Sequence, residues 1–349
     1  MANGIGPKTF KLLLQGFGSA EKAWNASASE LEPILKPVLT FKFLSFRSEY
    51  NSKKYNEQFK RQKISVIAMS DKEYPQLLKQ ITNPPIVLYV KGSVDLLSSK
   101  SNKIAVVGTR HITSYGRQIT EMFAADLAGA GLVVVSGMAL GVDGVAHKAT
   151  IDSGGKTIAV LGNGVDTPYP TENEKLYEEI LDSGGAVLSE FPPGMPPSIG
   201  SFPSRNRIVA GLSLGVLVTE GASDSGSLIT ANFGLEFGRK VFAVPGPITS
   251  PLSKAPLDLI SKGARLVTST DDILRELNIK SSSSQIKNSP KGETKEEKLV
   301  LKILENEPLD FDEIARLTKI DSSKLASIIS MMEIKGIIKT LSGGTFSST

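Results

Sequence analysis

Six short apolar runs, which alternate with helical stretches, limit the fold of this chain more than any other feature of its sequence. The runs occupy residues 104–107, 132–135, 157–161, 186–188, 216–218 and 241–244. Each is rich in β-branched side chains and bounded by glycine or proline, and stretches of helical period such as 115–128 and 173–181 lie between them. This alternation predicts an α/β fold with a doubly wound, Rossmann-like parallel sheet. In such a sheet the turns that follow the strands gather at one edge, where ligands bind.

The composition removes several classes of site. The chain has 349 residues, enough for two or three domains. Its formal net charge of +4 permits nucleic-acid binding without arguing for it. The sequence has no cysteine, which excludes disulfides, thiol catalysis and thiolate metal sites. Only two histidines occur, His111 and His147, so a histidine-rich metal site is excluded and no metal is predicted.

The hydropathy pattern predicts a cytoplasmic protein that does not enter a membrane. The longest uncharged stretch, 127–142, is short for a bilayer span and is interrupted by four glycines. The N-terminus lacks the basic and then apolar pattern of a signal peptide.

Changes in composition divide the chain into four predicted segments. Residues 1–62 form a helical domain of the SAM or helix-hairpin-helix type, and residues 63–280 form the Rossmann-like core. Residues 281–297 form a flexible linker rich in Ser, Lys and Glu, and residues 298–349 form a winged-helix domain. The opening Gly4-Ile5-Gly6 turn could present amides to a DNA phosphate, but a tight turn in a small helical domain is the preferred interpretation, because too few residues precede Gly4 to form a first helix.

The last domain shows the apolar spacing of three short helices followed by a closing hairpin. Many winged helices bind DNA, but residues 298–349 carry seven basic and seven acidic side chains. The expected recognition helix, 322–334, is mostly apolar. A protein-contact or structural role therefore has at least as much support as groove reading.

Polar turns follow several of the predicted strands. They contain Gly108, Thr109 and Arg110 after the first strand, Ser136, Gly137 and Gly141 after the second, and Ser225, Gly226, Ser227 and Thr230 after the fifth. A short segment before the fifth strand adds Phe202, Pro203, Arg205, Asn206 and Arg207. Guanidinium groups and helix-start amides suit phosphate, and a neighbouring aromatic ring favours a nucleic-acid strand. The glycines alone are also explained by tight strand-to-helix turns. No dinucleotide fingerprint or Walker A sequence occurs, so no cofactor is predicted.

No catalytic residue is assigned. Glu190 and Glu220 each end a predicted strand and could act as acid or base, but no nucleophile, metal cluster or orienting group accompanies them. His147 follows Asp143 on a helix, where a catalytic pair is possible and a packed histidine is commoner.

In this order, the motifs resemble those of the DNA-processing protein A family, DprA or Smf. The resemblance covers the whole chain and rests on Val107-Gly108-Thr109-Arg110, Ser136-Gly137, Gly141-Val142-Asp143, His147, Ala159-Val160-Leu161-Gly162, Tyr169-Pro170-Thr171-Glu172-Asn173, Leu188-Ser189-Glu190, Phe202-Pro203, Arg205-Asn206-Arg207, Val244-Pro245-Gly246 and, most strongly, Ser225-Gly226-Ser227-Leu228-Ile229-Thr230-Ala231.

The resemblance implies a non-enzymatic protein with an extended Rossmann core that binds single-stranded DNA. It also implies that the protein protects incoming strands during natural transformation, helps to load the RecA recombinase and forms a homodimer. By analogy, the turn and segment residues named above form the DNA pocket, with a base stacked near Phe202.

Four positions depart from the family pattern. Basic residues that are usual there are missing at Leu140, Ser204 and Asp224, and an asparagine is replaced by Leu257. Each lost positive charge is expected to weaken phosphate contact, and Lys254 is the candidate to compensate. Two other functions therefore stay open. One is a Rossmann-type enzyme that cleaves nucleotide phosphates, although its Pro-Gly-Gly-x-Gly-Thr-x-x-Glu run is missing. The other is an adaptor with weakened DNA binding.

Overall fold

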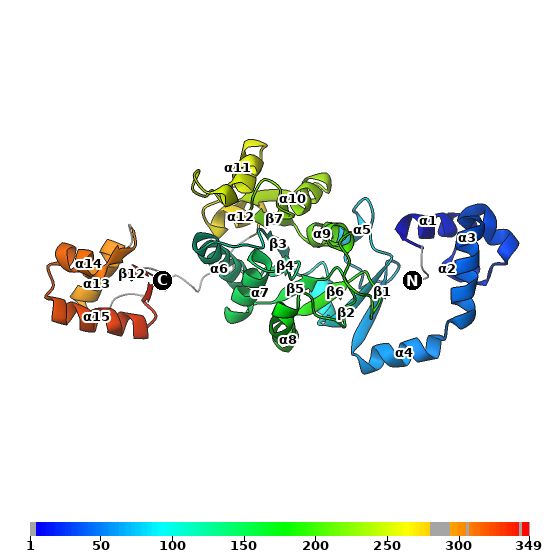
Figure 1. Ribbon diagram of the computed structural model, residues 1–349, viewed down its shortest axis with the longest axis horizontal. Coiled ribbons are helices and arrows are strands. Elements are labelled where there is room, and N and C mark those ends of the chain that lie inside the picture. Colours follow the sequence, from blue (N-terminus) through cyan, green and yellow to red (C-terminus); the bar gives the residue numbers. More distant parts are fainter. Residues whose placement is uncertain (1–4, 280–293, 305–306, 342–343, 349) are drawn as a thin grey trace. The chain divides into compact units, whose positions relative to one another are not determined.

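The computed structural model describes residues 5–279, 294–304, 307–341 and 344–348, and the chain divides into two compact units, 1–281 and 282–349 (Figure 1). Among these residues, the first unit holds the N-terminal helices and a large sheet, and the second holds three helices with a small sheet. Most of the predicted linker, residues 280–293, lies outside the described residues.

In the described residues the large sheet has nine strands, in the order β1-β2-β6-β5-β4-β3-β7-β8-β9. The strands are β1 (Ile64–Ala68), β2 (Val87–Gly92), β3 (Lys103–Val107), β4 (Val133–Ser136), β5 (Thr157–Val160), β6 (Ala186–Ser189), β7 (Gly215–Val218), β8 (Lys240–Ala243) and β9 (Arg265–Leu266). All pairings from β6 to β9 are parallel, whereas β1 and β2 are antiparallel. The predicted doubly wound sheet is confirmed, and its six predicted strands are β3 to β8.

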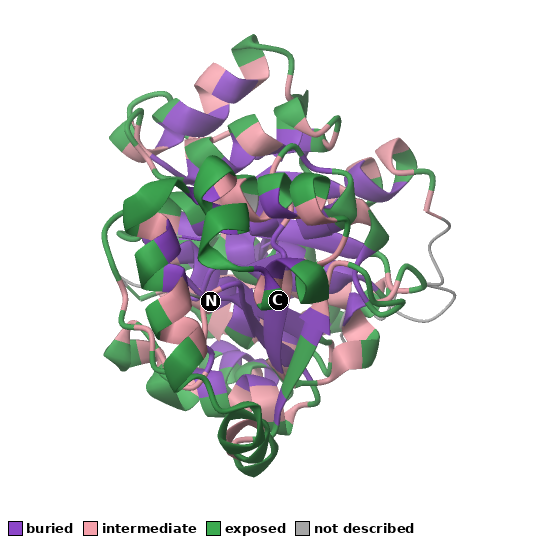
Figure 2. Cartoon of the chain, turned by 90° about the vertical axis from the view of Figure 1, so that its right-hand side faces the viewer, coloured by how far each residue is buried: buried purple, intermediate pink, exposed green. Residues whose placement is uncertain are grey.

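Helices cover both faces of this sheet (Figure 1). One face carries α6 (Ser114–Gly129), α7 (Val142–Asp152), α8 (Glu174–Asp182) and α12 (Thr270–Glu276), and the other carries α5 (Gln76–Lys79), α9 (Ser201–Leu212), α10 (Ser227–Glu236) and α11 (Lys254–Ser261). Alternate residues of β3 show why: Ile104 packs with Phe123 of α6, whereas Ala105 packs in the cluster of Val209 from α9. Because both faces are covered there, strands β3 to β7 are buried throughout, and the interior of the sheet is purple in Figure 2.

The strand order places a switch point between β3 and β7. From β3 the chain builds β4, β5 and β6 on one side and then returns past β3 to build β7 and β8 on the other. The loops that leave the carboxyl ends of β3 and β7 therefore diverge, and open α/β sheets bind their ligands at such a point. Short 3₁₀ helices lie at Val94–Leu97, Thr171–Asn173 and Pro251–Ser253.

The N-terminal helices have an apolar cluster of their own, which includes Leu13, Leu31 and Phe43. They are α1 (Pro7–Phe17), α2 (Ala20–Asn25), α3 (Ala28–Glu49) and α4 (Ser52–Arg61). Within α3, Lys36 has a φ of 62° and breaks the helix, because the residue before a proline avoids the helical region. Of the opening turn, Gly4 lies outside the described residues, and Gly6 is the N-cap of α1.

The second unit has the predicted winged-helix pattern. It contains α13 (Lys295–Leu304), β10 (Leu309–Asp310), α14 (Phe311–Thr318), α15 (Ser322–Ile334), β11 (Ile338–Thr340) and β12 (Thr345–Ser348), with the strands antiparallel in the order β10-β12-β11. The predicted linker end at 297 is wrong, because α13 already begins at Lys295. Thr294 and Glu297 exchange cap hydrogen bonds of 3.0 and 3.1 Å, which start the helix earlier.

Candidate nucleic-acid interface

The turns after β3 and β4 touch each other at the carboxyl edge of the sheet. The Thr109 backbone N–H donates to the Glu220 carbonyl (2.7 Å), and the Val142 N–H donates to the Thr109 carbonyl (3.0 Å). Gly141 has a φ of 73°, and a Cβ at this position would lie 2.3 Å from the Thr109 carbonyl oxygen. Only glycine therefore lets the two turns approach so closely. The structure brings Gly108, Thr109 and Gly141 together as the sequence predicted.

Arg205 lies beneath this edge rather than on it. It is 5% exposed and donates to the carbonyls of Gly137 and Val160, at the ends of β4 and β5. A Cβ at Gly137 would lie 2.6 Å from the Arg205 Nη2 and 2.8 Å from Asp143 Oδ2. Burial lowers the pKa of Arg205 to about 10 although Asp143 opposes the shift. Arg205 therefore connects α9 to the carboxyl ends of β4 and β5 through hydrogen bonds.

Arg207 is also buried and fully engaged. Its two terminal nitrogens donate to both Glu190 oxygens at 2.7 Å each, and its Nε donates to the Asn83 carbonyl at 3.0 Å. Such a fork-to-fork pair fixes both side chains in one geometry. Of the three consecutive predicted site residues, only Asn206 reaches the loop after β7, where its amide donates to the Gly226 carbonyl (3.3 Å).

Both carboxylates that end strands have structural partners. Glu190 pairs with Arg207. Glu220 accepts from the Thr113 N–H (2.9 Å) and the Thr113 hydroxyl (2.6 Å), which anchors the start of α6. Both carboxylates are therefore held in fixed positions by these contacts.

His147 is packed inside the protein. Its Nδ1 lies 2.7 Å from the Thr157 hydroxyl, which donates its own proton to the Val134 carbonyl. The Nδ1 atom must therefore be the donor, and Nε2 has no hydrogen-bond partner among the described residues. Burial and then the Arg205 charge lower the pKa of His147 to about 3. The histidine is neutral and structural, as the commoner interpretation held.

Two aromatic rings stack at the same edge. Phe202 and Tyr169 have ring centroids 5.5 Å apart and planes inclined by 21°. Phe202 lies against Gly162, where a Cβ would come within 2.9 Å of the ring, and Tyr169 is 39% exposed. The Asn163 amide donates to the Thr167 carbonyl (2.7 Å) and so holds the loop that carries Tyr169. The outer ring of the stack is Tyr169.

Sequence reasoning assigned no role to Tyr169, although the residue lies in a motif of the family resemblance. The available signal was its position: a tyrosine in the loop after β5 must reach the same sheet edge as Phe202.

The loop after β7 forms the start of α10. The hydroxyls of Ser225 and Ser227 lie 2.8 Å apart, and the Ser227 N–H donates to the Ser225 hydroxyl (3.3 Å). Gly226 and Asp224 are exposed, whereas Ser227 and Thr230 are buried.

Free positive charge at this edge is sparse. Arg110 is exposed and makes no hydrogen bond or ion pair within the described residues, yet it lies close enough to lower the pKa of Arg205. Lys254 is exposed but pairs with Asp258 at 3.2 Å. Leu140, at 40% exposure, and Ser204 bring no charge. Ser136 is buried and donates to the Val106 carbonyl, and Pro203 is exposed at the start of α9.

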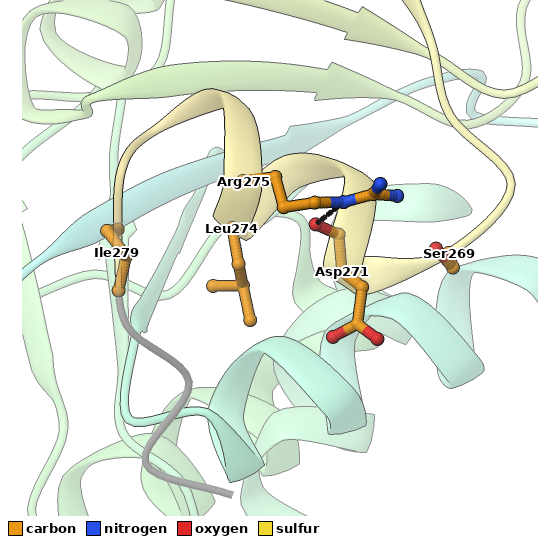
Figure 3. A pocket seen from close by; sticks show the side chains of 5 residues that line it. All are labelled: Ser269, Asp271, Leu274, Arg275 and Ile279. Carbon is orange, nitrogen blue, oxygen red and sulfur yellow. Dashed lines mark hydrogen bonds between the residues drawn. The ribbon is translucent and has the colours of Figure 1, made fainter.

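A hollow of about 460 Å³ beside α12 contains none of the predicted site residues. Figure 3 shows its five lining residues, among which the Arg275 Nε donates to the Asp271 carbonyl at 3.2 Å. No described helix is both long enough and apolar enough to cross a membrane.

The fold and the edge together define a doubly wound α/β protein with polar turns and an aromatic stack at its switch point, followed by a winged helix. The family model of the DNA recombination-mediator protein A matches residues 65–278, and that of the DprA winged helix domain matches residues 286–344. The chain therefore belongs to the DprA family, as the motifs predicted.

Relatives agree with this assignment. The DNA processing protein DprA of Bacillus subtilis is 45% identical over 219 residues, which cover 63% of this chain and 73% of that protein. The solved DprA structure from Streptococcus pneumoniae matches with a TM-score of 0.70 at 38% identity, over 79% of this chain and 94% of that one. The Helicobacter pylori structure, described for its single-stranded DNA binding mode, matches with a TM-score of 0.55 at 31% identity, over 62% and 95%.

Proposed function

We propose that this protein binds single-stranded DNA along the carboxyl edge of its sheet and acts as a recombination mediator. The observation that carries the proposal is the Tyr169–Phe202 stack at the same sheet edge as the free guanidinium of Arg110. Aromatic faces for bases, combined with cations for the backbone, are the recurring means of binding single strands without sequence preference. The Helicobacter pylori relative is described as a single-stranded DNA binder, which supports the proposal.

The predicted residues divide into two roles under this proposal. Arg110, the Thr109 turn and the exposed Gly226 at the start of α10 contact phosphates. Tyr169 stacks on a base and Phe202 supports its ring. Arg205 and Arg207 act from below: they hold α9 and the strand ends in place, because their donors are already occupied.

The edge should bind with a weak dependence on salt. Leu140, Ser204 and Asp224 bring no positive charge, and Lys254 is partly neutralised by Asp258. Each neutralised phosphate of a single strand contributes a slope of about −0.7 in log affinity against log salt. We expect the total slope of log affinity against log salt to be no steeper than about −2, because few free cations face this edge.

The test is fluorescence anisotropy of a labelled oligo-dT across a salt series, with unlabelled duplex as competitor. Single-strand preference together with a shallow slope supports the proposal. No binding at low salt overturns it. The same preparation, incubated with nucleotides and analysed for released phosphate or base, tests the enzyme alternative, and turnover would favour that function.

We further propose that the bound strand is passed to the RecA recombinase during natural transformation, and that the protein acts as a cytoplasmic homodimer. The recombination-mediator family of the chain supports this step. Light scattering measures the oligomeric state, and RecA ATPase activity on single strands with and without the protein measures loading. We also propose that residues 1–62, residues 63–280 and the winged helix, predicted as 298–349 and beginning with α13 at Lys295, are separate domains.

One observation favours an adaptor role for the winged helix. On α15, Ser323, Ser327 and Ile334 are exposed and uncharged, while Lys324 pairs with Glu296 at 2.8 Å. A helix that reads a DNA groove usually carries cations on this face as well as hydroxyl donors such as these serines. We propose that α15 contacts a protein, which a duplex-binding assay on the full chain and its Lys324→Ala variant tests: equal, weak duplex binding by both is the expected result.

A further inference from the structure

A second cavity lies between the N-terminal helices and the β1–β2 pair, and Pro192 and Pro193 from the loop after β6 also line it. Its volume is about 860 Å³. Its lining is largely aliphatic and aromatic, with side chains from α1, α2, α3, α4, β1 and β2, and Asn56, Gln58 and Ser70 are among its few polar members. This volume is in the range of ligand sites, and its apolar lining calls for an apolar occupant.

Aromatic rings form a continuous wall of the cavity. Tyr50 and Tyr55 stack with centroids 5.1 Å apart, Tyr55 contacts Phe59 at 6.2 Å, and Phe59 contacts Tyr89 of β2 at 5.9 Å. Tyr50, Tyr55 and Val66 are nevertheless 40%, 37% and 44% exposed. Large apolar side chains that gather in one exposed place mark interaction sites more often than single exposed residues do.

The edge of β1 beside this cavity is open. β1 pairs only with β2 among the described strands. The Met69 N–H donates to the Ile86 carbonyl (2.9 Å), so every second residue of β1, counted back from Met69, bonds to β2. Residues 67 and 65 then bond toward β2, whereas the backbone groups of Ile64, Val66 and Ala68 point outward. Asp71 bonds both outward groups of Ala68: the Ala68 N–H donates to the Asp71 Oδ2 (2.8 Å), and the Asp71 N–H donates to the Ala68 carbonyl (2.9 Å). No described group bonds the outward N–H and C=O of Ile64 and Val66.

Basic residues flank the cavity. On α4 and just after it lie Lys53, Lys54, Lys60, Arg61 and Lys63, against one acidic residue, Glu57. None of the five makes an ion pair within the described part of the chain. At helical spacing they fall on either side of the cavity-lining residues Tyr55 and Phe59.

We propose that this cavity binds an extended acidic segment of a partner polypeptide. The segment adds to the open edge of β1 through Ile64 and Val66, inserts a bulky apolar side chain between Tyr55 and Val66, and directs its carboxylates toward α4. The base faces of a nucleic-acid strand also suit these rings, but its backbone has no N–H donors to pair with the outward carbonyls of Ile64 and Val66. The outward backbone groups of β1 also match a polypeptide backbone.

The probe is a fluorescein-labelled peptide, Asp-Phe-Asp-Leu-Asp-Phe-Asp, measured by anisotropy against the full-length protein. Its alternation puts apolar and acidic side chains on opposite faces of a strand. We expect saturable binding that weakens at least about tenfold when lysine replaces each aspartate of the peptide. A peptide with proline at its centre should also bind more weakly, because it cannot continue the ladder.

Two matched variants locate the site. Val66→Pro removes only an outward N–H and should abolish peptide binding, whereas Val66→Thr keeps that N–H and should retain it. Lys54→Glu should weaken binding several-fold without altering the fold, which thermal melting checks. Equal affinity for the aspartate and the lysine peptides would overturn the proposal. Equal affinity of Val66→Pro and Val66→Thr for the aspartate peptide would overturn it as well.

The result is separable from the proposed DNA function. Val66 and Lys54 are not among the residues of the proposed DNA edge, so their variants should bind oligo-dT as the parent protein does. Competition between oligo-dT and the peptide, with loss of oligo-dT affinity in Lys54→Glu, would show instead that the cavity belongs to a nucleic-acid path, and would equally overturn the peptide proposal.

Discussion

Arg110 and Arg207 have different expected roles: Arg110 binds the ligand, and Arg207 stabilises the fold. Arg110 is exposed and without a partner among the described residues, whereas Arg207 forms a buried fork with Glu190. Arg110→Ala should weaken oligo-dT binding about fivefold to tenfold at low salt and leave the melting temperature unchanged. Anisotropy and thermal melting on the same sample measure both effects.

Arg207→Ala should show the opposite pattern. Removing one partner of a buried pair leaves the Glu190 charge uncompensated, at a cost of about 3–5 kcal/mol of unfolding free energy. The double change Arg207→Met with Glu190→Gln removes both charges and should recover much of this loss. A single Arg207→Ala variant that melts normally and has lost DNA binding would show that Arg207 contacts the strand directly.

His147 gives the protein a predictable sensitivity to acid. Its pKa is about 3 in the folded protein and about 6.5 when unfolded, so the unfolded chain binds the extra proton first as pH falls. Stability from this group is complete above pH 6.5 and is lost progressively toward pH 3. Between pH 7 and 4.5 the loss should be about 2–3 kcal/mol.

Urea unfolding at both pH values measures that loss. His147→Asn is the control, because its amide can still bond Thr157 while it does not titrate. An equal loss in the variant and the parent would assign the acid sensitivity to other groups.

At the scale of elements, the loop after β5 and the start of α9 meet in the Tyr169–Phe202 stack. If a base stacks on the outer ring, Tyr169→Ala should lower oligo-dT affinity by about 1–3 kcal/mol, and Tyr169→Phe should keep it. An oligonucleotide that carries 2-aminopurine reports directly, since stacking quenches its fluorescence. Quenching that survives Tyr169→Ala but disappears in Phe202→Leu would place the base on Phe202 instead.

The accuracy of the sequence-based prediction also follows the elements. Strands β3 to β8 could be predicted because both of their faces are buried, so that they appear as unbroken apolar runs. β1 and β2 could not, because residues such as Ser65 and Val66 are exposed and the strands join the sheet antiparallel. The predicted turns do meet at one edge. The inward direction of Arg205 and Arg207 could not be predicted, because it depends on how α9 packs against β4, β5 and Glu190.

For the whole molecule, the division into two compact units carries the last prediction. Residues 1–281 contain the complete sheet, both of its helical layers and every residue of the proposed DNA edge. The winged helix has its own apolar cluster, which includes Val300, Ile314 and Leu325. Units with separate cores fold independently when few contacts cross between them.

A chain that ends at residue 281 should therefore fold, melt cooperatively and bind oligo-dT within about twofold of the full-length affinity. Circular dichroism and anisotropy check both expectations, and the separate 282–349 chain should fold while binding neither oligo-dT nor duplex DNA. Loss of oligo-dT binding in a folded 1–281 chain would move part of the DNA site onto the winged helix. In that case the uncharged face of α15 would have to contact the bases of the strand rather than its phosphates.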